Sequence, residues 1–277
     1  MEWWNDLWLN EGFATWVGWL AVDHLFPEWD IWSEFVAEDL QYALGLDGLS
    51  SSHPIDVPVK NAAEIAQIFD AISYSKGASV IRMLVNYLGE EAFQSGIRSY
   101  LKLHRYSNAK TSDLWNSLSS SSNKSVSDMM NAWTMKIGYP ILQVTSEIDN
   151  DKLNLKVSQH RFLYDGRLFD SDDQTLWCIP LNVKHTLNQT CENHLLSMRE
   201  GFISIPKDVD FFKINSEQTG FYRVLYPIYW LHKLGKAVEF GHFGISDRVG
   251  IISDLFAASI AGKIKLVDCL EILEYYR

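Results

Sequence analysis

The stretch WWNDLWLNEGFATW, residues 3–16, gathers tryptophan, leucine and phenylalanine side chains around Glu11 near the start of the chain. Apolar residues follow helical spacing over residues 7–26, and Pro27 marks the end because proline cannot continue the helical hydrogen-bond ladder. These aromatic side chains must be buried, so we expect further chain to precede Met1. The last segment, KIKLVDCLEILEYYR at residues 263–277, is helical in pattern and ends without a polar tail, so we also expect chain to follow it.

The composition is that of a globular protein with two or three packed units, because 47% of the 277 residues are hydrophobic and 21% are charged. A net charge of -11 disfavours nucleic acid and anionic membranes as partners. No apolar run reaches the roughly 20 residues that a bilayer crossing needs, and no basic segment opens the chain as in a signal peptide. We therefore predict a soluble protein without a membrane segment in this chain.

Cys178, Cys191 and Cys269 are too few and too scattered for a disulfide framework or a thiolate zinc site. They favour a reducing, cytoplasmic location. Asn123 and Asn188 each begin a glycosylation sequon, but two such matches are expected by chance in a chain of this length, so we give them little weight.

The pattern of apolar residues divides the chain into three units. Residues 1–137 are predicted to be all-helical, 138–226 to form a small β-sandwich, and 227–277 to be helical again, with Ser246 as a helix cap and Gly262 as a stop. The expected helices of the first unit are 7–26, 29–44, 62–70, 75–88, 90–104, 110–119 and 125–136. The expected strands are 141–146, 153–157, 175–183, 201–205 and 211–215. A turn-rich excursion at residues 45–61 separates the second and third helices, and such loops often border active sites.

Two segments resemble the aminopeptidase N family of zinc peptidases, which includes the puromycin-sensitive aminopeptidases and belongs to the gluzincins. WWNDLWLNEGFATW resembles the part that follows the zinc helix, and FDAISYSKGASVIRML at residues 69–84 resembles the catalytic-tyrosine segment. The likeness continues in SSHPIDVPV, NAKTSDLWNSLS, WTMKIGYPI, FFKINSEQTGFYRVLY and SDRVGIISDLF, in the family's order. It implies a multidomain α+β fold: the helical half of a thermolysin-like catalytic domain, then a β-sandwich, then the start of an α-helical C-terminal domain.

Glu11 corresponds to the family's third zinc ligand, which lies within an NEG-[FL]-A motif and joins two histidines of an HExxH motif. A glutamate at a helix start is ordinarily a solvated or capping residue that meets the helix dipole. Among so many apolar neighbours, however, a lone carboxylate loses hydration unless a cation matches it. With the resemblance, we expect Glu11 to be a metal ligand for one zinc ion in the intact enzyme.

Tyr74 corresponds to the family's catalytic tyrosine, whose hydroxyl donates a hydrogen bond to the oxyanion formed when water attacks the first peptide bond. The ordinary interpretation is a half-buried structural tyrosine. Its place before Ser-Lys-Gly in a long matching segment favours the catalytic role. Asp70, four residues earlier, is interpreted as a helix cap.

The chain lacks other parts that the resemblance calls for. No two of its histidines are four residues apart, so it contains no HExxH, and the family's GAMEN segment, which holds the substrate's free amine, is also absent. The resemblance implies an aminopeptidase that acts on peptides with a free N-terminus, with broad preference for basic and apolar first residues. We expect this chain alone, without the N-terminal half of the enzyme, to be inactive and to bind zinc weakly.

A non-catalytic binding or regulatory module derived from the same family is the main alternative. It requires a partner that covers the tryptophan-rich face. A helical scaffold of no hydrolase ancestry would require Glu11 and Tyr74 to be coincidences.

Overall fold

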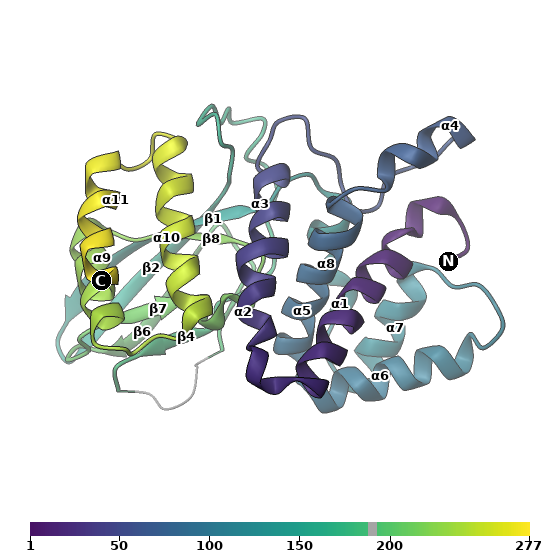
Figure 1. The fold of residues 1–277 in the computed structure, drawn as a ribbon, viewed down its shortest axis with the longest axis horizontal. Helices are drawn as coiled ribbons and strands as arrows, with labels where there is room; N and C mark the ends of the chain where they lie inside the picture. The colour runs from purple at the N-terminus through teal and green to yellow at the C-terminus, as the bar shows by residue number, and fades with distance from the viewer. Residues whose placement is uncertain (188–192) are drawn as a thin grey trace.

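A computed structural model describes residues 1–187 and 193–277. Helices occupy the N-terminal half, a set of small sheets follows, and helices return at the end (Figure 1). The sequon that begins at Asn188 and the residue Cys191 lie outside the described residues. No helix in residues 1–187 or 193–277 is both long and apolar enough to cross a membrane.

The N-terminal helices contribute Trp8, Phe35, Leu84 and Trp133 to a hydrophobic core that continues into the sheets and the C-terminal helices. Each predicted helix has a counterpart, and α1 stops two residues before Pro27, as expected. The helices are α1 (Trp8–Leu25), α2 (Ile31–Phe35), α3 (Gln41–Asp47), α4 (Ala62–Ile65), α5 (Gly77–Leu88), α6 (Glu90–Leu103), α7 (Thr111–Ser122) and α8 (Val126–Met135). A π-helical turn, Val36–Leu40, joins α2 to α3, and a second one, Ile72–Lys76, leads into α5.

Two of the predicted helices in this half have different bounds. The helix predicted at 62–70 is only the short α4 followed by a 3-10 turn, Ala66–Ile68. The helix predicted from Ser75 is divided into the π-helical turn Ile72–Lys76 and α5. The turn begins three residues before Ser75, because the Asp70 Oδ1 accepts hydrogen bonds from the N–H groups of Ile72 and Ser73. Asp70 therefore acts at a helix start, as predicted.

The sheets begin directly after α8. The strands are β1 (Pro140–Asp149), β2 (Lys152–Arg161), β3 (Ile179–Pro180), β4 (Val183–His185), β5 (Leu195–Leu196), β6 (Glu200–Pro206), β7 (Phe212–Ile214) and β8 (Arg223–Leu225). A four-stranded sheet has the order β6-β2-β1-β8, with β8 parallel to β1 and the other pairs antiparallel, and two-stranded ladders join β3 to β5 and β4 to β7. Leu153, Leu155 and Val157 are buried on one face of β2, which confirms the predicted alternation.

The strand predicted at 175–183 is wrong over its first half. The Trp177 backbone N–H donates to the Gln159 Oε1 at 2.9 Å, and the Gln159 Nε2 donates back to the Trp177 carbonyl at 2.9 Å. A buried side-chain amide thus satisfies the backbone groups that a neighbouring strand would otherwise pair. Only Ile179–Pro180 and Val183–His185 are strands in this region.

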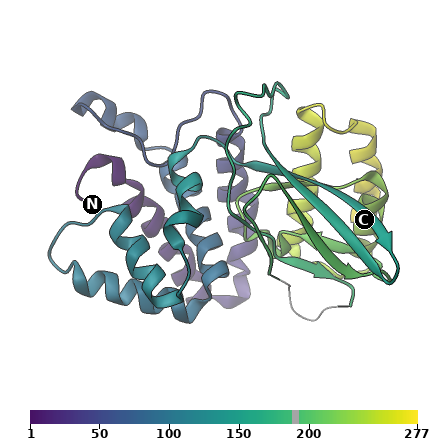
Figure 2. The same cartoon turned by 180° about the vertical axis from the view of Figure 1, so that it is seen from behind.

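The C-terminal helices α9 (Ile228–Glu239), α10 (Ile245–Ile260) and α11 (Leu266–Leu273) lie beside the sheets, on the side away from the viewer in Figure 2. Gly262 follows the end of α10 with a left-handed φ of 70°, as predicted for a stop. Ser246 is not the cap of α10, because the helix begins at Ile245 after Gly244. The Ser246 hydroxyl is instead 3.1 Å from the hydroxyl of Ser33 on α2.

Buried charges hold the helical half against the sheets. The Lys76 Nζ lies 2.7 Å from the Asp47 Oδ2, and neither side chain is exposed. Both also bind the backbone just before β1: Lys76 donates to the Gly138 carbonyl, and the Gly138 N–H donates to the Asp47 Oδ1 at 3.1 Å. Gly138 has a φ of 85°, which favours glycine.

A second buried network surrounds Arg223 of β8. Its guanidinium donates to Asp254 of α10 at 3.0 Å and to Gln41 of α3 at 3.4 Å. It also donates to the hydroxyls of Tyr139 and Tyr164, at 3.1 and 2.9 Å. One side chain therefore joins the sheet to both sets of helices.

Asp47→Asn should destabilise the chain strongly. The amide keeps an oxygen for Gly138 but leaves the Lys76 ammonium unpaired in the interior, and breaking a buried pair in this way costs about 3–5 kcal/mol. Urea unfolding would measure the loss. Glu200→Gln, at the half-exposed pair with Lys156, is the control and should change little. An Asp47→Asn protein as stable as wild type would contradict the role given to this pair.

Candidate active site

Glu11 and Tyr74 come together at the start of α1. Glu11 lies in the first turn of this helix and Tyr74 in the π-helical turn Ile72–Lys76, and both side chains are partly exposed. The Glu11 carboxylate near the Tyr74 hydroxyl raises the pKa of Tyr74, because it favours the protonated phenol and because losing that proton would set two negative charges side by side. The two residues singled out in the sequence therefore share one site.

The turn that carries Tyr74 is fixed by its polar neighbours. The Ser73 hydroxyl donates to the Ile68 carbonyl at 2.6 Å, and the Ser75 hydroxyl donates to the Asp39 Oδ1 at 2.6 Å. Lys76 is held by Asp47. The other four residues of the turn are buried, so Tyr74 alone presents its side chain outward from it. A π-helical turn is uncommon and often marks a functional site.

His53 is a member of this region that the sequence did not reveal. Its Nε2 lies 2.7 Å from the Asp70 Oδ2, and its Nδ1 lies 2.7 Å from the Pro54 carbonyl. A carbonyl and an ionised carboxylate can only accept, so this geometry favours the imidazolium form of His53, in which both ring nitrogens carry protons. Because Asp70 also binds the N–H groups of Ile72 and Ser73, His53 ties the 45–61 excursion to the start of the tyrosine turn.

The hydrogen bond to Asp70 raises the pKa of His53 above its ordinary value of 6.5. Partial burial raises the pKa of Asp70, but the hydrogen bond from His53, the charge of His53 and the N–H groups of Ser73 and Ile72 together outweigh it. The pKa of Asp70 therefore lies below its usual value. Each group stabilises the charged form of the other. The segment SSHPIDVPV already stood out by resemblance, but a single histidine in a loop has no periodic pattern that would assign it a partner.

The described residues do not by themselves fit a catalytic zinc site. Such a site takes three protein ligands and leaves one position open. Glu11 offers one carboxylate, and nowhere in residues 1–187 and 193–277 do three His, Cys, Asp or Glu side chains lie close enough to hold an ion.

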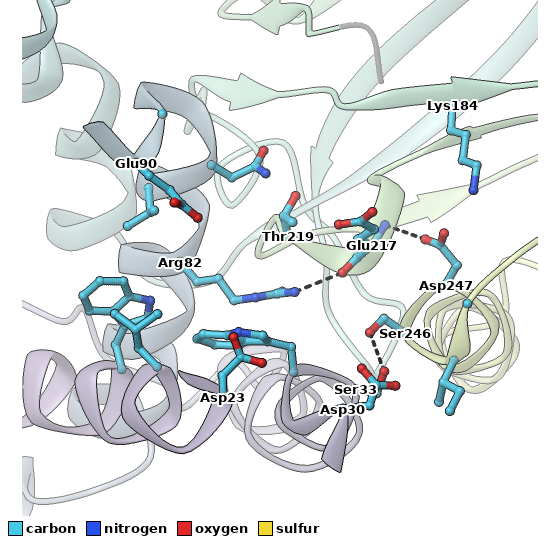
Figure 3. A pocket seen from close by; sticks show the side chains of 18 residues that line it. Asp23, Asp30, Ser33, Arg82, Glu90, Lys184, Glu217, Thr219, Ser246 and Asp247 are labelled. Carbon is cyan, nitrogen blue, oxygen red and sulfur yellow. Dashed lines mark hydrogen bonds between the residues drawn. The ribbon is translucent and has the colours of Figure 1, made fainter. Parts of the chain in front are cut away.

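A cavity of about 640 Å³ lies elsewhere, between α1, α2, α5 and the segment that leads to α10. Arg82 lines it and donates to the backbone carbonyl of Glu217 at 3.2 Å (Figure 3). Arg82 also donates to the backbone carbonyl of Gln218 at 2.6 Å. Neither Glu11 nor Tyr74 lines this cavity. It belongs to the contact between the helical half and the turn before β8, and it is not the candidate active site.

Comparisons with known proteins identify the family to which the matched segments belong. Residues 1–133 match the peptidase family M1 domain, and residues 211–277 match the ERAP1-like C-terminal domain. This chain belongs to peptidase family M1. The resemblance seen in the sequence and the multidomain α+β fold are both confirmed.

Several relatives from this family are aminopeptidases. The chain is 47% identical over 275 residues to Aminopeptidase 2 of Candida albicans, a match that covers 99% of this chain and 29% of that protein. It is 44% identical over 292 residues to Aminopeptidase M1 of Arabidopsis thaliana, covering 100% of this chain and 32% of that protein. It is 41% identical over 277 residues to the alanine/arginine aminopeptidase of Saccharomyces cerevisiae, covering 100% and 31%. The chain thus spans about a third of the length of these relatives.

The His53–Asp70 pair predicts a specific pH dependence of stability. The folded pKa of His53 is raised, so its stabilisation is complete below pH 6.5 and is lost as the pH rises through the folded pKa. The folded pKa of Asp70 is lowered, so its stabilisation is complete above its ordinary value of 3.8 and is lost as the pH falls through the folded pKa.

We expect His53→Gln to lower the free energy of unfolding near pH 6 and to flatten its decline above pH 6.5. Urea unfolding across pH 5 to 9 would measure both. His24→Gln, at an exposed histidine near the end of α1, is the control. Parallel curves for wild type and His53→Gln above pH 6.5 would show that His53 has no raised pKa.

Proposed function

We propose that residues 1–277 supply part of the active site of a zinc aminopeptidase that removes the first residue from peptides with a free N-terminus. The observation that carries the proposal is the meeting of Glu11 and Tyr74, which lie far apart in the sequence, in one partly exposed site. The aminopeptidase relatives support it. The domain bounds 1–137, 138–226 and 227–277 are proposed with it.

Glu11 is proposed as one ligand of a zinc ion whose other ligands come from residues outside this chain. Its place in the first turn of α1 fixes the carboxylate on a rigid element. The ion, when bound, would polarise the substrate carbonyl and lower the pKa of water. A single carboxylate binds zinc weakly, so we propose that residues 1–277 alone are inactive.

Tyr74 is proposed as a hydrogen-bond donor to the oxyanion that forms on the substrate carbonyl. A donor must keep its proton at working pH, and the raised pKa of Tyr74 keeps the phenol neutral. The buried serines and lysine of its turn hold the hydroxyl in place before the reaction, which is what electrostatic stabilisation requires.

A chimera tests both roles. In it, residues 1–277 replace the matching segment of Candida albicans Aminopeptidase 2. We expect this protein to bind one zinc ion and to cleave an aminoacyl reporter. Glu11→Gln should lose zinc, measured by metal analysis after dialysis, and activity with it. Tyr74→Phe should keep zinc and lower kcat by about 10²–10³-fold, because one preorganised donor is removed.

Tyr42→Phe is the matched control, since Tyr42 is exposed on α3 and should leave kcat unchanged. Residues 1–277 alone should hold no stoichiometric zinc after the same dialysis. A folded chimera in which Tyr74→Phe retains full kcat would rule out the proposed role of Tyr74. Stoichiometric zinc in the isolated chain would rule out the dependence on outside ligands.

A further inference from the structure

We propose that a backbone contact between Gly12 and Gly77 is the positioning device that sets the separation of Glu11 and Tyr74. The inference rests on the proposed function, because it concerns the same site. It assigns a positioning role to Gly12 and Gly77, which have no side chain with which to act on a substrate.

The two glycines follow the two site residues closely in the chain. Gly12 comes directly after Glu11 in α1, and Gly77 opens α5 directly after the π-helical turn that carries Tyr74. The Gly77 N–H closes that turn by donating to the carbonyls of Tyr74 and Ile72. A displacement of either glycine is therefore passed to its catalytic neighbour over one to three residues.

The helices touch at these two positions without any side chain between them. A Cβ added to Gly12 would lie 3.0 Å from the Gly77 carbonyl carbon and 3.0 Å from the Gly77 Cα. A Cβ added to Gly77 would lie 3.1 Å from the Gly12 Cα. Carbon atoms in contact prefer about 3.5–4.0 Å, so a single methyl group must push α1 and the tyrosine turn apart.

Relief by a rotating side chain is impossible here, because the atoms that block each methyl belong to the backbone of the opposite helix. Both glycines are buried, and Ala78 beside them has no exposed surface. Glycine also disfavours the interior of a helix. Helix stability alone would therefore favour alanine at Gly12, whereas the close approach requires glycine.

Gly18 provides a matched control within the same helix. A Cβ at Gly18 has no heavy atom within 4 Å. Gly18→Ala thus makes the same chemical change in α1 as Gly12→Ala, with the same gain in helix propensity but without the contact.

The experiment uses residues 1–277 with ¹³C at the ζ carbon of tyrosine, read by NMR at pH 7. The Tyr74 resonance is identified by its loss in Tyr74→Phe, and its position without the carboxylate is given by Glu11→Ala. We expect Gly12→Ala and Gly77→Ala each to move this resonance toward the Glu11→Ala position. Gly18→Ala should leave it at the wild-type position.

A folded Gly12→Ala protein whose Tyr74 resonance stays at the wild-type position would overturn the proposal. Loss of folding in both Gly12→Ala and Gly77→Ala would assign the contact to stability and would overturn it as well. This readout needs neither metal nor activity, so it can succeed where the proposed function fails.

In the chimera with Candida albicans Aminopeptidase 2, Gly12→Ala should lower kcat by about 10²-fold, since a misplaced catalytic group costs roughly that much, with KM nearly unchanged. A change confined to KM would also count against a positioning role. If the chimera itself is inactive while the NMR shift is seen, the proposed function fails and the positioning device stands.

Discussion

An ammonium group and a carboxylate, neither with any exposed surface, meet where the helical half joins the first strand. Lys76 and Asp47 bind the carbonyl and the N–H of Gly138. The backbone is therefore fixed two residues before β1 begins. Lys76 is also the last residue of the turn that carries Tyr74. The Lys76 side chain therefore holds both the turn of the candidate active site and the backbone that leads into the sheets. The position of the site relative to the sheets depends on this one side chain.

Three different kinds of contact determine where Tyr74 lies. Ion pairing holds the end of its turn at Lys76, the imidazolium of His53 holds its start through Asp70, and the backbone contact of Gly12 with Gly77 limits its distance from α1. These contacts come from segments that are far apart in the sequence. Such over-determination is what preorganisation of a catalytic group requires.

Much of this could be predicted from the sequence. Apolar periodicity found the helices and the change to strands, and the two family-like segments pointed to Glu11 and Tyr74. The π-helical turns were missed, because their apolar spacing over one turn does not differ from that of an α-helix. The strand at Trp177 was over-extended, because the Gln159 amide that replaces a neighbouring strand lies far away in sequence. Ser246 has the side chain of a cap but bonds to another helix.

Arg223 has a consequence for how the chain unfolds. Its guanidinium contacts Gln41 in the first set of helices, Tyr139 next to β1 and Asp254 in the last set. Detaching Asp254 would leave the guanidinium in the interior without its counter-ion, which costs several kcal/mol, and detaching Gln41 or Tyr139 would remove a hydrogen bond to a buried charge. The secondary structure changes type near residues 138 and 227, but these positions do not separate independently unfolding units. We expect the three segments to unfold together in one cooperative transition.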